Sequence, residues 1–143
     1  MWRNKQFLIR CQALKEAGFE PEFEPGAHLC RGFADLGFEE YCLLSGDRLL
    51  SIFTGTITEL HEAEKSHLFE IPSISRAANW LHKTGWDVSS IITQDQRSWC
   101  LSMKHHSTQE EIVVEERSID GVFLEAILLA LKNVDNEASQ INS

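Results

Sequence analysis

The sequence lacks the long apolar runs that membrane proteins need. No stretch reaches the roughly 18 consecutive apolar residues of a membrane-spanning helix, and the longest candidate is the interrupted segment 122–131 inside a helical pattern. Residues 1–18 carry basic side chains, but Arg10 and Gln12 break their short apolar stretch, so they lack the apolar core of a secretory signal. We therefore expect a cytoplasmic protein without a membrane segment.

The sequence also lacks the short motifs of nucleotide-binding, redox and zinc sites. Its 8 glycines are scattered singly, and none belongs to a glycine-rich phosphate-binding loop. Its 4 cysteines, at positions 11, 30, 42 and 100, include no Cys-x-x-Cys pair. Cysteine is often buried and the cytoplasm is reducing, so free core thiols are expected. We expect no cofactor.

Basic residues are too few for a nucleic-acid-binding surface. The chain has 13 Lys and Arg against 22 Asp and Glu, a net charge of -9 at pH 7, and the acidic surplus is spread over both halves. Because affinity for phosphate backbones comes mainly from Lys and Arg, direct binding of nucleic acid is not expected. The acidity either serves solubility or matches a basic partner protein.

What the sequence does contain is a His-Glu pair followed by a second histidine, in TELHEAEKSH at residues 58–67. The zinc-protease motif places two histidines four residues apart on one face of a helix. Here the second ring, His67, would be turned roughly 240° from His61 on a helix, or would lie about 20 Å away on a strand. One ion cannot bind both, so we interpret the segment as a polar connector or a surface helical turn.

The length of 143 residues is enough for one domain with its own core. Apolar residues make up 43% of the chain and charged residues 24%, which is typical of a globular protein and argues against disorder or a fibrous repeat. We expect a single domain over residues 1–134 and a flexible tail over residues 135–143.

The residue patterns predict the order helix, three or four strands, helix, three strands, helix. Apolar residues at helical spacing predict helices over residues 4–17, 74–84 and 119–134, with Ser73 and Ser118 as N-caps of the last two. Alternating and β-branched runs predict strands at 27–33, 39–44, 48–55, 88–94, 97–105 and 110–117. The fold class is therefore α+β, an antiparallel β-sheet packed by helices.

One of these patterns is a hairpin around the turn Ser45-Gly46-Asp47. Its apolar side chains are predicted to pack, and they are Tyr41, Leu43, Leu49, Ile52 and Phe53.

The last predicted helix is unusually apolar. Only Asp120, Glu125 and Lys132 are charged between residues 119 and 134. Such a helix must be mostly buried, either against the sheet or against another chain. Leu128 and Leu131 are therefore our candidate interaction residues, and a homo-oligomer formed through this helix is one alternative.

Three segments between residues 68 and 132 share their order with a known family. They are LFEIPSISRAANWLHKTGW, RSWCLSM and SIDGVFLEAILLALKNV, and they contain Pro72, Ser73, Trp99, Ala126, Leu129 and Ala130. This order resembles the phage-type ABA sandwich domain, with a helix after a Pro-Ser pair, a Trp-containing β-meander and a final helix rich in Ala and Leu. The resemblance implies a phage or prophage origin and a fold. It implies no catalytic or binding residue, because the family has no established activity.

The best local group of potential catalytic side chains is Lys104, His105 and His106, at the end of a predicted strand. A general base must lie within hydrogen-bond reach of the group it activates. Adjacent strand residues point to opposite faces, so at most one of the two histidines could serve a given site. A metal site is a second option, built from His28, Cys30 and Cys42, although no fourth ligand is recognisable.

Two function classes follow from these observations. Our main hypothesis is a small acidic, non-catalytic protein-interaction factor, such as a phage adaptor, an inhibitor or an immunity-like protein with a basic partner. A chaperone for a secreted effector is a variant of it. The alternative is a small hydrolase or metal-binding enzyme that uses His105 or His106, or the site at His28, Cys30 and Cys42.

Overall fold

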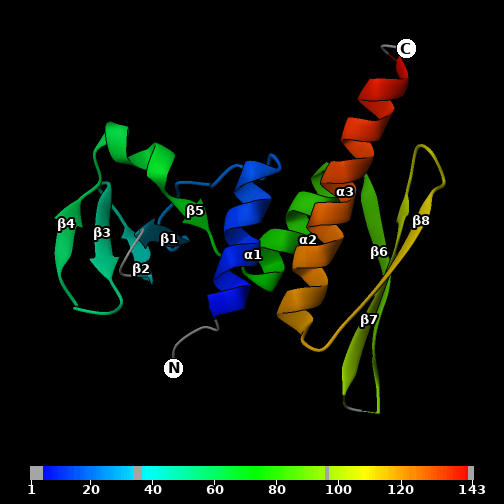
Figure 1. Cartoon of the computed structure of the whole chain (residues 1–143), viewed down its shortest axis with the longest axis horizontal. Coiled ribbons are helices and arrows are strands. Elements are labelled where there is room, and N and C mark those ends of the chain that lie inside the picture. Colours follow the sequence, from blue (N-terminus) through cyan, green and yellow to red (C-terminus); the bar gives the residue numbers. More distant parts are fainter. Residues whose placement is uncertain (1–4, 34–36, 96, 142–143) are drawn as a thin grey trace. The chain divides into compact units, whose positions relative to one another are not determined.

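The chain folds into two compact units, Met1–Pro72 and Ser73–Ser143 (Figure 1), in a computed structural model that describes residues 5–33, 37–95 and 97–141. Each unit combines an antiparallel sheet with helices, which confirms the α+β class and the predicted order of elements. The single domain expected over residues 1–134 thus contains two sheets, each in its own unit.

The first unit is built around a five-stranded antiparallel sheet with the order β4-β3-β2-β1-β5. Its elements are α1 (Lys5–Glu16), β1 (His28–Phe33), β2 (Gly37–Leu44), β3 (Arg48–Ser51), β4 (Ile57–Glu59), the 3-10 helix η1 (Glu62–His67) and β5 (Phe69–Glu70). The hairpin of β2 and β3 turns at residues 45–47 as predicted. Of the segment 58–67, expected to be a polar connector or a surface helical turn, residues 62–67 form η1, while residues 58 and 59 belong to β4. The short strands β4 and β5 are additional. Asn4, the predicted start of α1, lies outside the described residues.

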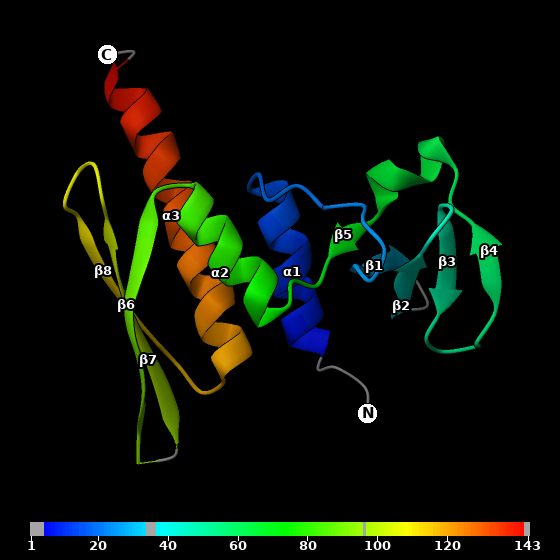
Figure 2. The same cartoon turned by 180° about the vertical axis from the view of Figure 1, so that it is seen from behind.

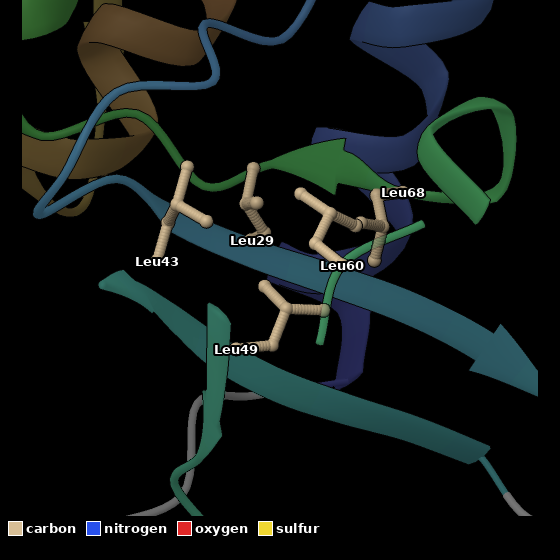
Figure 3. Packing of buried hydrophobic residues seen from close by; sticks show 5 residues of the cluster. All are labelled: Leu29, Leu43, Leu49, Leu60 and Leu68. Atoms are coloured by element: carbon tan, nitrogen blue, oxygen red, sulfur yellow. The ribbon is translucent and has the colours of Figure 1, made fainter. Parts of the chain in front are cut away.

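Leucines fill one side of this sheet (Figure 3). The buried cluster consists of Leu29, Leu43, Leu49, Leu60 and Leu68, with Phe23, Ala27 and Tyr41 packed against it. Alternation along the strands explains the choice, since Leu43 faces Leu49 across the hairpin while their neighbours point to the other side. The helix α1 buries Leu8, Cys11 and Leu14 and contacts β5.

One packing prediction in the hairpin is wrong. Leu43 and Leu49 are buried, but Ile52 is 52% exposed and Phe53 is 67% exposed. The strand β3 ends at Ser51, so these two side chains lie in the turn to β4 and no longer alternate with the core positions. Because β3 ends earlier than predicted, two large apolar side chains that were expected in the interior lie at the surface.

The second unit is a three-stranded meander covered by two helices on one face (Figure 2). Its elements are α2 (Ile74–Lys83), β6 (Trp86–Gln94), β7 (Ser98–His105), β8 (Glu111–Glu116) and α3 (Ile119–Ile141). The helix α2 contacts β6, α3 contacts β7 and β8, and the two helices contact each other. Both predicted N-caps are confirmed: the hydroxyl oxygens of Ser73 and Ser118 accept hydrogen bonds of 3.0 Å from the backbone N–H groups of Arg76 and Gly121.

The two faces of this sheet differ sharply. Leu101 and Met103 on β7 and Val114 on β8 are buried on the helix side. On the opposite face, Ile92 is 51% exposed and Val113 is 65% exposed. A register shift between Val88 and Ser90 interrupts the alternation in β6. Gln96, which lies between the strands predicted at 88–94 and 97–105, is outside the described part of the chain.

The final helix is longer than its apolar pattern predicts. It continues to Ile141, so residues 135–141, expected to belong to a tail, are helical, while residues 142–143 lie outside the described part. The segment DNEASQI has no proline or glycine that would end a helix. Among the described residues, no helix has the length and apolar character needed to cross a membrane.

Candidate functional site

The imidazole of His105 is a structural part of the turn between β7 and β8. Its Nδ1 atom accepts hydrogen bonds from the backbone N–H groups of Ser107 (3.2 Å) and Thr108 (3.3 Å). An accepting nitrogen carries no proton, so in the neutral ring the proton is on Nε2. The ring lies edge-on to Trp86, with 5.0 Å between the centroids. His105 therefore ties the turn to the first residue of β6.

Nε2 of His105 lies over the backbone of Gly85, where an added Cβ would be 2.6 Å away. The other candidate, His106, is exposed, and its backbone N–H donates to the carbonyl of Gly85 (3.0 Å). The two imidazoles are stacked, with centroids 5.4 Å apart and an interplanar angle of 16°. The prediction that they point to opposite faces is wrong, because β7 ends at His105 and strand alternation ends with it. The contacts of His105 fit a turn-holding role.

The three predicted metal ligands do lie on one face of the first sheet. His28 is the cross-strand partner of Cys42, and Cys30 that of Glu40. Nε2 of His28, however, lies 2.9 Å from Oε1 of Glu40, a carboxylate that the predicted site did not include. Burial, and after it the nearby Glu40 carboxylate, raises the pKa of Cys30 to about 12, which disfavours the thiolate that a metal would bind. In residues 5–33, 37–95 and 97–141, no group of three or more His, Cys, Asp or Glu could hold a metal ion.

None of the four cysteines forms a disulfide. Cys11 and Cys30 are buried, while Cys42 and Cys100 are half-buried.

The apolar character of α3 is largely accounted for inside the chain. Its buried side chains are Val122, Phe123, Leu124, Ala126, Ile127 and Ala130. The candidate interaction residues Leu128 and Leu131 are half-buried. Dimerisation through this helix stays a prediction, and the burial shows that the composition of the helix does not require a second chain.

A different apolar surface is exposed at the turn between β3 and β4, and sequence reasoning missed it. This tip patch consists of Ile52 (52% exposed), Phe53 (67% exposed) and Ile57 (52% exposed). The signal was present in the sequence IFTGTI, where two large apolar residues directly precede a Thr-Gly turn.

Backbone hydrogen bonds hold the turn that carries the tip patch. The N–H of Gly55 donates to the carbonyl of Ser51 (2.8 Å), and the N–H of Ser51 donates to the carbonyl of Thr56 (2.9 Å). Gly55 adopts φ 74°, which a side chain would oppose. The N–H of Thr54 adds a bond of 3.3 Å to the hydroxyl of Ser51. The turn is thus held by hydrogen bonds within the chain itself.

A polar network anchors the same turn to the sheet. The hydroxyl of Ser51 donates to Oε1 of Glu39 (2.8 Å), and the phenol of Tyr41 donates to Oε2 (2.8 Å). Burial and the hydrogen bond to Glu39 raise the pKa of Tyr41 above its ordinary value, so the phenol keeps its proton and remains a donor. Ser51 is 5% exposed. The tip patch is therefore attached to a fixed support.

The strand β4 beside the tip patch is an edge strand, and all three of its residues are exposed. The N–H of Leu60 donates to the carbonyl of Asp47 (2.7 Å), and the N–H of Ser51 donates to that of Thr56 (2.9 Å). Because hydrogen-bonded pairs alternate in an antiparallel ladder, the next hydrogen-bonded residue of β4 is Thr58. Ile57 and Glu59 consequently direct their backbone N–H and carbonyl groups away from β3. This edge can accept a further strand.

The chain matches no protein-family model, no curated protein and no solved structure. The resemblance of residues 68–132 to the phage-type ABA sandwich domain stays a prediction.

Proposed function

We propose that this chain is a non-catalytic protein-interaction protein of the cytoplasm, which binds an extended segment of a basic partner protein along β4 and the tip patch. The observation that carries this proposal is Phe53. It is an aromatic side chain, 67% exposed, on a turn that its own hydrogen bonds keep in place.

The tip patch has the chemistry of an interface core. Aromatic residues are enriched in protein interfaces and often supply most of the binding energy. A rigid support also lowers the entropy lost on binding, and the bond from Ser51 to Glu39 supplies one here. Burying Phe53 and Ile52 in a partner should contribute about 2–3 kcal/mol together, because each is still half or more exposed in the free chain.

The free edge of β4 specifies the conformation of the partner. An extended segment that adds to an edge strand gains main-chain hydrogen bonds, while pockets or patches read its alternate side chains. The outward backbone groups of Ile57 and Glu59 offer such a ladder next to Phe53. A strand added here would place its side chains directly beside the tip patch.

Charge favours a basic partner over a second copy of this chain. Glu59 on β4 and Asp47 at the other end of the hairpin are exposed, Arg48 is the cross-strand partner of Glu59, and Glu62 forms an ion pair of 3.0 Å with Lys65. The chain as a whole carries -9 at pH 7, so two copies repel each other. A segment rich in Lys or Arg would gain from the same field.

Affinity capture with two matched double variants tests this function. The protein and its Ile52→Ala/Phe53→Ala variant are used to capture proteins from a lysate of the source organism at low and high salt. The control is Ile92→Ala/Val113→Ala, which truncates side chains of similar exposure in the second unit. We expect one basic protein to be captured by the wild type and the control, to be lost at high salt, and to bind the tip variant roughly 30- to 140-fold more weakly.

A pair of edge variants separates strand addition from charge. Glu59→Pro removes the charge and an outward N–H, and an edge strand tolerates proline at such a position. Glu59→Gln removes only the charge. Binding that is weakened much more by Glu59→Pro than by Glu59→Gln supports strand addition. The proposed surface is contradicted if the captured protein binds Ile52→Ala/Phe53→Ala as tightly as the wild type. It is also contradicted if Ile92→Ala/Val113→Ala weakens binding as much as Ile52→Ala/Phe53→Ala does.

A further inference from the structure

The first unit contains a hollow of about 500 Å³ whose lining comes from several elements. It is formed by α1 (Gln12, Lys15, Glu16), β1 (Arg31, Gly32, Phe33), η1 (Ser66, His67) and β5 (Phe69). This volume falls in the range of small-molecule sites, about 300–1,000 Å³. The tip patch lies on the β3–β4 turn, and none of its residues lines the hollow.

The charge of the hollow is opposite to that of the chain. Lys15 and Arg31 are cationic at neutral pH, and Glu16 is the only acidic side chain among the described residues that line the hollow. The whole chain has 13 basic residues against 22 acidic ones. Cations gathered in one concave place within an acidic protein favour an anionic ligand.

The cationic side chains keep donors available. Nζ of Lys15 donates to the carbonyl of Ser66, which leaves two of its three N–H groups. The guanidinium of Arg31 lies over the ring of Phe33, 5.2 Å from its centroid, which holds the planar group in place. Its cross-strand neighbour Glu39 accepts hydrogen bonds from Tyr41 and Ser51. The fork of Arg31 suits a carboxylate or a phosphate, since it can donate two parallel hydrogen bonds.

Gly32 keeps the hollow open. Its φ is not in the left-handed region, so its backbone conformation does not demand glycine. A Cβ there would approach Phe38 at 3.3 Å and the amide nitrogen of Gln12 at 3.4 Å. A second hollow of about 380 Å³ shares Gln12, Gly32 and Phe33 with the first and adds Lys5. The two hollows meet at this glycine, which leaves room for a ligand with an apolar body.

From this arrangement the structure assigns a binding site for a small organic anion. The carboxylate or phosphate of the ligand is held by Lys15 and Arg31, and its apolar body lies against Phe33. The amide of Gln12 supplies a further polar group at the junction of the two hollows. This site is independent of the proposed partner surface and uses none of its residues.

Binding of simple aromatic anions tests the site. Phenyl phosphate, benzoate, the neutral analogue benzamide and inorganic phosphate are titrated into the full chain, with calorimetry and backbone amide NMR shifts as readouts. We expect saturable binding of phenyl phosphate or benzoate, with shifts centred on residues 12–16 and 31–33. Benzamide and inorganic phosphate should bind at least tenfold more weakly. The comparison of the two aromatic anions shows which acidic group the site prefers.

Charge variants locate the binding. Lys15→Gln/Arg31→Gln should weaken the anion at least tenfold, while Arg48→Gln, which removes a cation of the same unit outside the hollow, should leave its affinity unchanged. If the double variant fails to fold, Lys15→Gln alone replaces it, because this substitution changes only a position on the helix surface. It should also weaken binding of the anion. No saturable binding of either anion at millimolar concentration overturns the inference, and so does equal weakening by Arg48→Gln.

Discussion

Replacing Gly85 with alanine tests how the second unit is closed at the end of α2. Gly85 has φ 100°, and an alanine Cβ would lie 2.6 Å from Nε2 of His105. The backbone conformation alone costs alanine about 1–3 kcal/mol. The imidazole cannot simply move aside, because it accepts hydrogen bonds from Ser107 and Thr108 and contacts Trp86, together worth about 1–2 kcal/mol. Gly85→Ala should therefore lower the free energy of unfolding by about 2–5 kcal/mol.

A double-mutant cycle separates the two contributions. His105→Ala removes the ring that the new Cβ would meet, so in that background Gly85→Ala should cost only its backbone part. The two substitutions should then be less destabilising together than the sum of their separate effects, by about 1–2 kcal/mol. This coupling measures the turn-holding role of His105, which a residue acting only as a catalytic base would not show.

Urea unfolding followed by tryptophan fluorescence is a suitable assay. Trp80, Trp86 and Trp99 all lie in the second unit, so their emission reports on the unit that is changed. Trp2 lies outside the described residues, and a Trp2→Phe background removes its signal. Additive effects, within about 0.5 kcal/mol, would refute the contact between residue 85 and His105. A loss of less than 1 kcal/mol for Gly85→Ala would refute the backbone argument as well.

Two more predictions concern the thiol of Cys30 and the cap of α2. The folded pKa of Cys30, about 12, lies above its ordinary value of 9.0, so the stability this group contributes is complete below pH 9 and is lost as pH rises toward 12. Between pH 9 and 10 the free energy of unfolding of the wild type should fall with pH, and Cys30→Ala should reduce this fall by up to about 1.4 kcal/mol per pH unit. An equal fall in the wild type and in Cys30→Ala contradicts the raised pKa of Cys30. Ser73→Ala should lower the free energy of unfolding by about 1 kcal/mol, because the N–H of Arg76 loses its acceptor, whereas Ser75→Ala, an exposed control inside the same helix, should not be destabilising. Equal effects of the two serine variants, measured by thermal or urea unfolding, would show that Ser73 does not act as a cap.

Local signals in the sequence were sufficient for most elements. The caps Ser73 and Ser118 precede apolar residues at helical spacing, and both accept the expected hydrogen bond. The turn Ser45-Gly46-Asp47 lies between two β-rich runs, and Gly46 and Asp47 take positive φ. Such features depend on a few neighbouring residues, which is why a single sequence reveals them.

The candidate sites depended on contacts that local patterns do not encode. The role of His105 follows from its approach to Gly85, 20 residues earlier, which the pairing of β6 with β7 brings to the same end of the hairpin. The hollow of the proposed anion site is lined by residues from α1, β1 and η1, and no spacing rule connects these segments in the sequence. The tip patch was misplaced because β3 ends at Ser51, and strand ends are poorly determined by residue preference alone.

The pairing of β5 with β1 has a consequence for the order of events during protein synthesis. Leu29 and Cys30 pair with Glu70 and Phe69, which leave the ribosome much later, whereas every neighbouring pair in the second sheet is consecutive along the chain. In the nascent first unit, one edge of β1 therefore stays unpaired until residue 70 has left the ribosome. The second sheet can form strand by strand as it is synthesised. In that interval Leu29 and Cys30 lack the strand partners Glu70 and Phe69 that they have in the finished protein, so the first sheet is completed only after most of its unit has been synthesised.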